Sequence, residues 1–494
     1  MRSFADSDGD GIGDLRGLTS RLDYLNDGDP AAGDDLGVTG LWLMPVMESP
    51  SYHGYDVIDY RAVERDYGTV EDMRALVREA HARGIAVIVD FPINHTSREH
   101  PWFQDSRTRG STHGDWYVWA DANPRYGGPS GQRVWHQDGD RWYYGLFWEG
   151  MPDLNLENPA VTTELEGIAR YWLTDLGVDG FRLDGAKHLV EQGERQGNTP
   201  ATHEWLRAFH AAVHAIAPDA LLVGEVWDAT SVAAGYVPED VDMVFEFGLA
   251  AAMRDAVRDE RAGGLAVVQQ DVAASYPRGG LGAFLTNHDM DRIATQLNGI
   301  PERLRLVASL LLTGPGTPFL YYGEEIGLQG GKPDERIRTP MPWDATQPAA
   351  GFSTAQPWEP LEADWRTVNV AAQAGDPTSL LSLYRSLIRF RDGHPALRRG
   401  DLVPVGSSSD AVDAVLRSTA GEQLLVLANV SDAPVSGVAL DLVAGPLCGS
   451  PVAEVVTGEG TPTAPTISPA GGFAGYVPLA MIPARSIVVV RLRP

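Results

Sequence analysis

Short apolar runs rich in β-branched residues alternate with amphipathic stretches between residues 38 and 323. This alternation is typical of repeated βα units around a parallel sheet, because a buried parallel strand is apolar on both faces and its crossover helix on only one. The pattern predicts seven strands, at residues 38–46, 85–91, 178–184, 220–227, 242–247, 283–289 and 317–323.

The helix between the first two of these strands has the clearest signals. Thr69 and Asp72 form a capping-box pattern at its start, and Gly84 marks its end. One face carries the apolar residues Val70, Met73, Leu76, Val77 and Ala80. The sequence therefore predicts one complete βα unit here.

Seven parallel strands with intervening helices predict an α/β fold, a (β/α)8 TIM barrel. Only residues 1–4 precede an acidic loop that should follow the first barrel strand, so we expect that strand to be missing or truncated. In such a barrel the active site lies at the carboxyl ends of the strands.

Two further regions depart from the βα pattern. The stretch after the 85–91 strand carries ten aromatic residues between Trp116 and Trp148 and is too long for an ordinary loop, so we expect a small inserted domain. After residue 400 short alternating strands without helical periodicity predict a C-terminal antiparallel β-sandwich. The expected division is barrel 1–94, inserted domain 95–155, barrel 156–400 and sandwich 401–494.

The net charge limits the class of partner. The chain has 39 Lys and Arg against 67 Asp and Glu, a formal net charge of −28, which argues against nucleic acid or an anionic membrane. Cys448 is the only cysteine, so an intrachain disulfide and a cysteine-based zinc site are excluded. No leader and no long apolar span is visible, and we expect a soluble monomer, with secreted and cytoplasmic locations both left open.

The opening stretch "ADSDGDGIGDL" has the oxygen ligands of a calcium loop. Aspartates alternate along it, and Gly11 stands where such a loop bends sharply. The bidentate glutamate of an EF-hand is absent, since Gly17 occupies that position, and a plain Asp/Gly turn without metal is the alternative. The predicted calcium ligands are the side chains of Asp6, Asp8, Asp10 and Asp14 and the backbone carbonyl of Ile12.

Acidic, basic and imidazole side chains gather where four predicted strands end. One aspartate at a strand end is usually a helix N-cap, but carboxylates from several strands at one mouth indicate catalysis. The residues are Asp90, Asn94 and His95; Arg182, Asp184, Lys187 and His188; Glu225; and His288 and Asp289.

These motifs resemble those of α-amylase-type enzymes of glycoside hydrolase family 13. Besides the four strand ends, "HGYD" at 53–56, "MPDLN" at 151–155 and "GTPFLYYGEEIG" at 316–327 match family signatures in the family's order, and "DSDGDGIGD" resembles the metal loop of many members. The resemblance spans nearly the whole chain and favours the calcium interpretation of the loop.

The resemblance implies a retaining glycoside hydrolase in which Asp184 is the nucleophile and Glu225 the acid/base. Retention needs one ionised and one protonated carboxyl about 5–5.5 Å apart. Arg182, two residues before Asp184 and so on the same strand face, is expected to keep that aspartate ionised. Glu225 has no cation adjacent in sequence, and a neighbouring Asp184 would favour its protonated form. Asp289 is expected to bind and distort the sugar.

Further residues are assigned by the same resemblance. Tyr55 is expected to stack on the sugar, while Asp90 and Asn94 brace the strand end, with Asn94 also a candidate ligand of a second calcium. Glu324 and Glu325 are expected to be structural. The implied substrate-binding residues are Tyr55, Asp56, His95, Arg182, Lys187, His188, His288 and Arg292.

Three functions remain open at this point. The first is an α-amylase cleaving α-1,4-glucosidic bonds of starch-like glucans and maltooligosaccharides, favoured by "DGAKH" and the short inserted domain. The second is an exo-acting α-glucosidase or glucosyl-transferring enzyme, favoured by "RTPMPWD" at 338–344. The third is a family-like binding protein without catalysis, against which the retention of Asp184, Glu225 and Asp289 argues.

Overall fold

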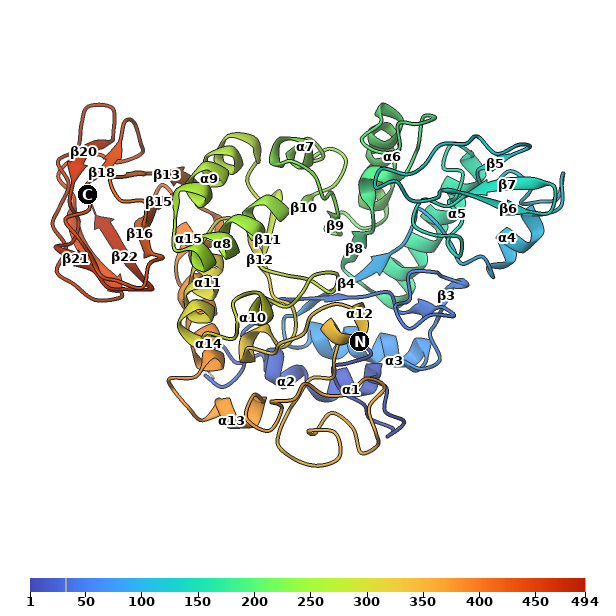
Figure 1. The fold of residues 1–494 in the computed structure, drawn as a ribbon, viewed down its shortest axis with the longest axis horizontal. Coiled ribbons are helices and arrows are strands. Elements are labelled where there is room, and N and C mark those ends of the chain that lie inside the picture. The colour runs from blue at the N-terminus through green and yellow to red at the C-terminus, as the bar shows by residue number, and fades with distance from the viewer. Residues whose placement is uncertain (32, 494) are drawn as a thin grey trace. The chain divides into compact units, whose positions relative to one another are not determined.

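A computed structural model describes residues 1–31 and 33–493 of the chain (Figure 1). The chain divides into two compact units. The first comprises Met1–Val226, Tyr236–Val244 and Phe352–Gln356, and the second comprises Trp227–Gly235, Phe245–Gly351 and Pro357–Pro494.

A seven-stranded sheet of parallel strands is the framework of the fold, in the order β1-β4-β8-β9-β10-β11-β12. All seven predicted strands are confirmed, and the sheet has one strand fewer than the eight of a closed barrel, as expected. The strands are β1 (Gly40–Leu43), β4 (Ala86–Phe91), β8 (Gly180–Leu183), β9 (Leu221–Gly224), β10 (Met243–Phe245), β11 (Leu281–Phe284) and β12 (Thr317–Phe319).

The register of this sheet determines which residues lie side by side at the carboxyl ends of β4, β8 and β9. Asp90 of β4 lies opposite Arg182 of β8, which in turn lies opposite Val223 of β9. Because parallel strands are in step, the residues after β8 and β9 emerge at the same edge of the sheet.

Helices of the first unit follow the predicted pattern. The capping box of Thr69 and Asp72 is formed, and α3 buries Met73, Leu76, Val77 and Ala80 of its predicted apolar face. The helices are α1 (Leu15–Ser20), α2 (Leu22–Leu25), α3 (Val70–His81), α4 (Pro101–Ser106), α5 (Pro159–Arg170) with a π-helical continuation η1 (Tyr171–Leu176), the 3₁₀ turn η2 (Ala186–His188) and α6 (Pro200–Ile216). A short hairpin pairs β2 (Met47–Glu48) with β3 (Asp59–Val63).

The predicted insertion holds α4 and a three-stranded antiparallel sheet in the order β5-β7-β6. Its strands are β5 (Trp119–Ala120), β6 (Trp135–Asp138) and β7 (Arg141–Tyr144). Trp135 and Tyr144 are buried, whereas Phe147 and Trp148 are 42% and 48% exposed. Aromatic residues therefore form both the core and part of the surface of this segment, whose status as a separate domain stays a prediction.

The second unit combines helices with antiparallel sheets. Its helices are α7 (Thr230–Ala234), α8 (Phe247–Asp259), α9 (Gly263–Ser275), α10 (Ile293–Gln296), α11 (Pro301–Thr313), the 3₁₀ turn η3 (Glu324–Ile326), α12 (Asp334–Ile337), α13 (Val370–Ala374), α14 (Leu380–Asp392) and α15 (Pro395–Arg399). The long helices α8 and α11 pack around a buried apolar core with Leu249, Met253, Leu306 and Val307.

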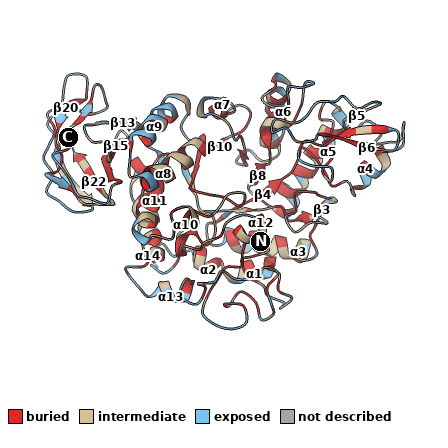
Figure 2. Cartoon of the chain, viewed as in Figure 1, coloured by how far each residue is buried: buried red, intermediate tan, exposed pale blue. Residues whose placement is uncertain are grey.

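The C-terminal segment is formed of antiparallel sheets, as predicted. One has five strands in the order β13-β15-β16-β22-β19, and β14-β18-β20 and β17-β21 form two smaller ones. Figure 2 colours the chain by burial, and the most buried of these strands are β15 and β16. The strands are β13 (Asp401–Pro404), β14 (Gly406–Ser407), β15 (Val412–Ser418), β16 (Gln423–Asn429), β17 (Val435–Ser436), β18 (Leu440–Leu442), β19 (Val452–Thr457), β20 (Phe473–Tyr476), β21 (Met481–Ile482) and β22 (Ser486–Arg493).

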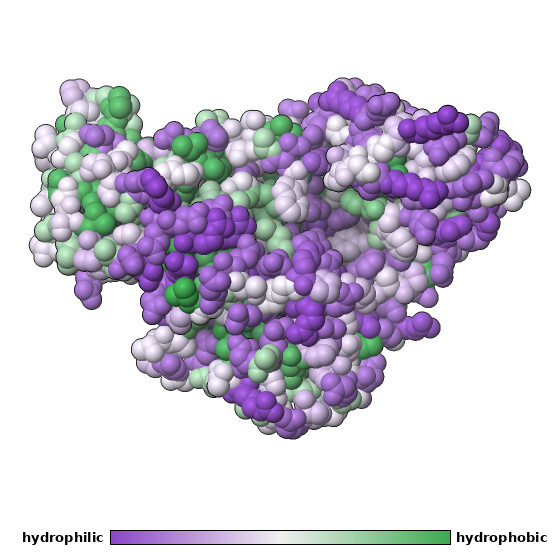
Figure 3. Space-filling view, viewed as in Figure 1, coloured by the Kyte–Doolittle hydropathy of each residue, from purple (hydrophilic) through white to green (hydrophobic). Residues whose placement is uncertain are grey.

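The surface is mainly hydrophilic on the face in view, with scattered apolar spots (Figure 3). None of the helices among residues 1–31 and 33–493 has both the length and the apolar character needed to cross a bilayer.

Candidate active site

Arg182 is the centre of a buried polar cluster at the carboxyl ends of β4, β8 and β9. Its Nη1 donates to both carboxylate oxygens of Asp90, at 2.9 and 3.0 Å, and to Asp184 Oδ1 at 2.7 Å. Its Nη2 donates to Glu225 Oε2 at 2.6 Å. One fully buried guanidinium thus brings together the predicted nucleophile and the predicted acid/base.

The contact between Arg182 and Glu225 adds to what the sequence shows. Glu225 has no cation adjacent in sequence, but Arg182, 43 positions away along the chain, is adjacent in space. Three carboxyl groups share one guanidinium, so full ionisation of Asp90, Asp184 and Glu225 would place three negative charges around the single positive charge of Arg182. The cluster is therefore built to retain a proton.

Burial is the dominant electrostatic influence on Asp90. It raises the pKa of this carboxyl to about 7, Arg182 opposes the rise, and the charge of Asp184 adds to it. Burial disfavours the charged form of Arg182, but Asp90 and Glu225 outweigh this and hold the pKa of the guanidinium well above its usual range. Arg182 is consequently a permanent cation.

Aromatic side chains hold Asp90 in place. Tyr55 Oη donates to Asp90 Oδ2 at 2.8 Å and Trp42 Nε1 donates to the same oxygen at 3.3 Å. The Arg182 guanidinium lies 5.3 Å from the Trp42 ring centroid and 5.7 Å from that of Tyr55. Asp90 is fully buried, which fits the bracing role expected for it.

His95 offers an unused nitrogen. Its ring is buried, and its Nε2 has no hydrogen-bond partner among the described residues. Burial lowers the pKa of His95 to about 4, so the imidazole is neutral at pH 7. A neutral ring with a free nitrogen suits a hydrogen bond to a sugar hydroxyl.

Asp56 is buried and engaged by hydroxyl groups. Ser49 Oγ donates to Asp56 Oδ1 at 2.8 Å, and Ser51 Oγ donates to the same oxygen. The second carboxylate oxygen is not part of these bonds, and the predicted sugar contact of Asp56 stays a prediction.

The predicted pair Lys187 and His188 lies on η2, directly after β8. His188 Nδ1 lies 2.5 Å from the Gln196 carbonyl oxygen. Phe147 lies beside this pair, with its ring centroid 5.2 Å from that of His95 and 6.4 Å from that of His188. Nothing in the sequence distinguishes Phe147 from the other nine aromatic residues between Trp116 and Trp148, so its place beside His95 and His188 is visible only in the structure.

In the second unit Arg338 holds the remaining predicted catalytic residue. Arg338 Nη2 donates to Asp289 Oδ1 at 2.9 Å, and its Nε donates to the His288 carbonyl oxygen at 2.9 Å. His288 Nε2 lies 3.1 Å from Asp289 Oδ2. Arg338 is the first residue of "RTPMPWD", and the sequence gives no sign of its contact with Asp289.

Arg292 is buried, and its guanidinium donates hydrogen bonds to backbone carbonyl oxygens. Its Nε donates to the Ile337 carbonyl at 2.9 Å and its Nη1 to the Tyr322 carbonyl at 2.6 Å, and the guanidinium lies over the rings of Tyr321 and Tyr322. The predicted contact of Arg292 with substrate stays a prediction. Glu324, expected to be structural, is buried and accepts a bond from Tyr384 Oη at 2.8 Å.

The opening aspartate loop places three of its four carboxylates together. Oxygen atoms of Asp6, Asp8 and Asp14 lie within 4.8 Å of one another. Asp10 is not in this group, and its Oδ1 accepts the Ile12 backbone N–H at 2.7 Å. The roles of Asp10 and of the Ile12 carbonyl as calcium ligands stay predictions.

Backbone N–H groups hold this loop. Asp6 accepts from Gly9 at 2.7 Å and from Gly11 at 2.8 Å, and Asp14 caps α1 by accepting from Gly17 at 2.7 Å. A second group of candidate metal ligands consists of His210, His214 and Asp242.

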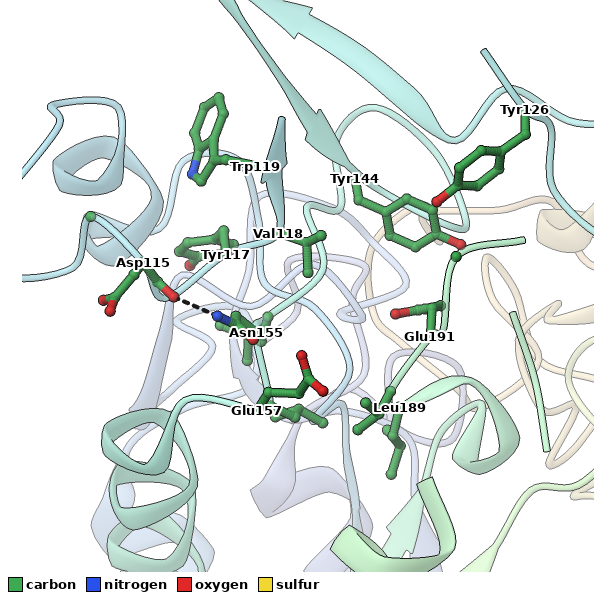
Figure 4. A pocket seen from close by; sticks show the side chains of 15 residues that line it. Asp115, Tyr117, Val118, Trp119, Tyr126, Tyr144, Asn155, Glu157, Leu189 and Glu191 are labelled. Atoms are coloured by element: carbon green, nitrogen blue, oxygen red, sulfur yellow. Dashed lines mark hydrogen bonds between the residues drawn. The ribbon is translucent and has the colours of Figure 1, made fainter. Parts of the chain in front are cut away.

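A cavity of about 390 Å³ lies elsewhere in the first unit (Figure 4). Its lining combines aromatic side chains with the carboxyl groups of Glu157 and Glu191, and Asn155 Nδ2 donates to the Asp115 carbonyl at 2.9 Å. None of the predicted site residues lines it. The strand-end cluster, not this cavity, is the candidate active site.

Comparison with known proteins agrees with this arrangement. Residues 1–400 match the family described as alpha amylase, catalytic domain. The chain belongs to the α-amylase family. As a member of this family of glycoside hydrolases, it is an enzyme that acts on α-glucans.

Several relatives within the α-amylase family are similar over most of the chain. "Alpha-amylase 3" of Dictyoglomus thermophilum is 35% identical over 436 residues, covering 87% of this chain and 83% of that protein. "Trehalose synthase/amylase TreS" of Mycolicibacterium smegmatis is 35% identical over 484 residues, covering 86% and 79%. The crystal structure of an alpha-amylase from H. orenii is 39% identical with a TM-score of 0.85, covering 100% of this chain and 98% of that one.

Proposed function

We propose that the protein hydrolyses α-1,4-glucosidic bonds in starch-like glucans and maltooligosaccharides with retention of configuration. The observation that carries this proposal is the shared guanidinium of Arg182, whose neighbouring nitrogens bind Asp184 and Glu225 at 2.7 and 2.6 Å. A retaining mechanism requires two carboxyl groups held close together, one ionised and one protonated.

Asp184 attacks the anomeric carbon while Glu225 gives its proton to the leaving glycosidic oxygen. Asp90, Asp184 and Glu225 share the cation Arg182, and this excess of carboxyl groups supports a proton retained within the cluster. We propose that Glu225 carries a proton when substrate binds. Once Asp184 is esterified its negative charge is lost, and Arg182 then favours the ionised form of Glu225. Glu225 in that form removes a proton from the water that hydrolyses the ester.

The sugar is bound by polar groups and aromatic faces. Asp289 binds and distorts it, with Arg338 and His288 orienting the carboxylate. His95 supplies a neutral hydrogen-bonding ring, and Tyr55 and Phe147 offer aromatic surfaces to the apolar faces of glucose. Asp56 and Arg292 are retained as further predicted sugar contacts.

We expect attack within the glucan chain. The pair Lys187 and His188 beside Phe147 supports binding on the leaving side, and the name of the D. thermophilum relative supports an amylase. An exo-acting α-glucosidase or glucosyl-transferring enzyme is the second candidate. Arg338 of "RTPMPWD" and the equally similar trehalose synthase/amylase favour it.

Soluble starch with blocked chain ends separates these candidates. The proposal predicts a rapid fall in viscosity and iodine staining, with short maltooligosaccharides first released as the α-anomer. Release of glucose alone from unblocked starch, with blocked chains untouched, would establish the exo-acting alternative.

Calcium is proposed as the ion of the opening loop. The three converging carboxylates of Asp6, Asp8 and Asp14 fit a hard cation that prefers oxygen ligands. Calcium would neutralise their mutual repulsion and so stabilise the loop. The proposed role of calcium is structural. That the protein is a monomer in solution stays a prediction.

A further inference from the structure

Two histidines and one aspartate form a compact group on the first unit, outside the candidate active site. His210 and His214 belong to α6, and Asp242 directly precedes β10. Residues four apart on a helix share a face, so α6 presents both rings together. His210 Nε2 and His214 Nε2 lie 3.0 and 3.1 Å from the same oxygen, Asp242 Oδ1.

The outer contact of His214 fixes its proton. Its Nδ1 lies 3.0 Å from the Pro218 carbonyl oxygen, which can only accept, so Nδ1 carries the hydrogen. In the neutral ring Nε2 then directs a lone pair at the Asp242 carboxylate. Two electron-rich atoms at this distance repel each other unless a proton or a metal ion lies with them. Histidines that bind metals typically donate their other N–H to a backbone carbonyl, as His214 does.

The carboxylate is oriented in the same way. Asp242 Oδ2 accepts the Leu222 backbone N–H at 2.7 Å, and the Asp242 N–H donates to the Leu222 carbonyl at 3.0 Å. Oδ1 is therefore the oxygen that both imidazoles share, and His214 Nε2 also lies 3.2 Å from Oδ2. The three side chains are 19%, 26% and 28% exposed, so an ion can enter from solvent.

We infer that His210 Nε2, His214 Nε2 and Asp242 Oδ1 form a site for a borderline divalent transition metal such as Zn²⁺. Two imidazoles and one carboxylate suit this class of ion, whereas calcium prefers oxygen ligands alone. Tetrahedral ligands about 2.0–2.1 Å from zinc are about 3.3 Å apart, close to the nitrogen–oxygen distances here. Three protein ligands leave a fourth position for water.

The site has a structural role, separate from the proposed hydrolysis. Asp242 and Leu222 lie at the starting ends of β10 and β9, whereas Glu225 follows the other end of β9. Glu225 lies three positions after Leu222, roughly 10 Å along an extended strand. A bound ion would therefore fasten α6 to the starting edge of the sheet, away from the reacting bond.

Calorimetric titration with zinc ion tests this inference. The protein is first freed of transition metals, and calcium is then added at saturation to occupy sites formed by oxygen ligands alone. The expected result is one zinc bound per chain. His210→Gln and His214→Gln should each weaken zinc binding at least ~10-fold. His203→Gln is the matched control, since His203 lies on the same helix and contacts Asp240 through one nitrogen without a second histidine. It should keep the parent affinity.

Cobalt(II) supplies a second readout, because a four-coordinate ion absorbs strongly in the visible range. The parent and His203→Gln should show these bands, and His214→Gln should not. If a histidine variant does not fold, Asp242→Asn tests the same site. This variant keeps an acceptor for the Leu222 N–H, which should preserve folding, but it loses the anionic metal ligand. Absence of zinc binding in the parent, or equal zinc affinity in Asp242→Asn and His203→Gln, would overturn the inference.

Discussion

The first unit contains two clusters of carboxylates that differ in how their charge is balanced. Asp90, Asp184 and Glu225 surround the buried guanidinium of Arg182, a cation that the chain itself supplies. The aspartates of the opening loop have backbone N–H groups as their main partners, and Asp8 is exposed.

The two clusters consist of the same chemical groups but differ in the source of the positive charge that balances them. A buried cation fixes the position and charge of the strand-end cluster at every calcium concentration. The loop carboxylates accept from amide and hydroxyl groups, which carry only partial positive charges, so the proposed calcium ion would add to their stability.

The largest expected effect is that of removing the internal cation. Arg182→Met would remove the buried cation that pairs with the buried Asp90 and with the partly buried Asp184 and Glu225, and it should lower the free energy of unfolding by about 3–5 kcal/mol. Turnover on starch should fall by roughly 10²-fold or more, since both predicted catalytic carboxyls lose their position. Denaturant unfolding and starch hydrolysis measure the two quantities.

Arg61→Met is the matched control for this variant. Arg61 pairs with Glu164 at the surface, where both side chains are at least one-third exposed. Such a pair contributes about 0–1 kcal/mol. If both substitutions had equally small effects on stability, the buried cluster would not depend on its cation.

A smaller effect is expected from removing calcium. At a calcium concentration one hundred times Kd, binding should stabilise the fold by about 2.7 kcal/mol, and chelation should reverse this. Asp8→Asn should abolish the response, whereas Asp10→Asn should retain most of it because Asp10 lies outside the converging group. Thermal unfolding with and without calcium measures both variants, and a melting temperature indifferent to calcium would favour the plain turn.

The last expected effect is a contrast in pH dependence, in which two variants change stability with opposite signs. Burial raises the pKa of Asp90 to about 7, so the folded state holds a proton that the unfolded chain has released above about pH 4. The free energy of unfolding should therefore fall as pH rises from about 4 to about 7, by at most about 1.4 kcal/mol per pH unit. Asp90→Asn should remove this component.

Asp6 should show the opposite sign. Burial alone would raise its pKa, but hydrogen bonds from Ser353 and from the backbone of Gly9 and Gly11 outweigh this and lower it. Its contribution to stability is present above the ordinary aspartate range and is lost as pH falls through the lowered pKa. Asp6→Asn should therefore reduce the loss of stability in acid, and Asp90→Asn should leave that loss unchanged. Identical pH profiles for the two variants would remove the contrast.

The sequence could predict the seven strands and α3 because their signals are local. Each predicted strand is a short apolar, β-branched run that polar residues follow. The capping box of α3 is contained in the four consecutive residues from Thr69 to Asp72. The residues at the ends of β4, β8 and β9 were predicted for the same reason.

Contacts that depend on register could not be predicted. Arg182 reaches Glu225 only because β8 and β9 lie in step, and Arg338 reaches Asp289 across 49 positions. In the opening loop the alternation of aspartates was visible, but the bond from Ile12 N–H that occupies Asp10 depends on the backbone turn. Phe147 required knowledge of which aromatic side chains remain outside the core of the insertion.

In the proposed mechanism Glu225 supplies a proton to the leaving oxygen, and Arg182 holds Glu225 beside Asp184. The most direct test compares Glu225→Gln with the parent on starch and on an aryl α-glucoside whose leaving group is a stable anion. The account predicts a loss of roughly 10²–10⁴-fold on starch and a much smaller loss on the aryl glucoside, which needs no acid to depart. Equal losses on both substrates would contradict the acid role of Glu225.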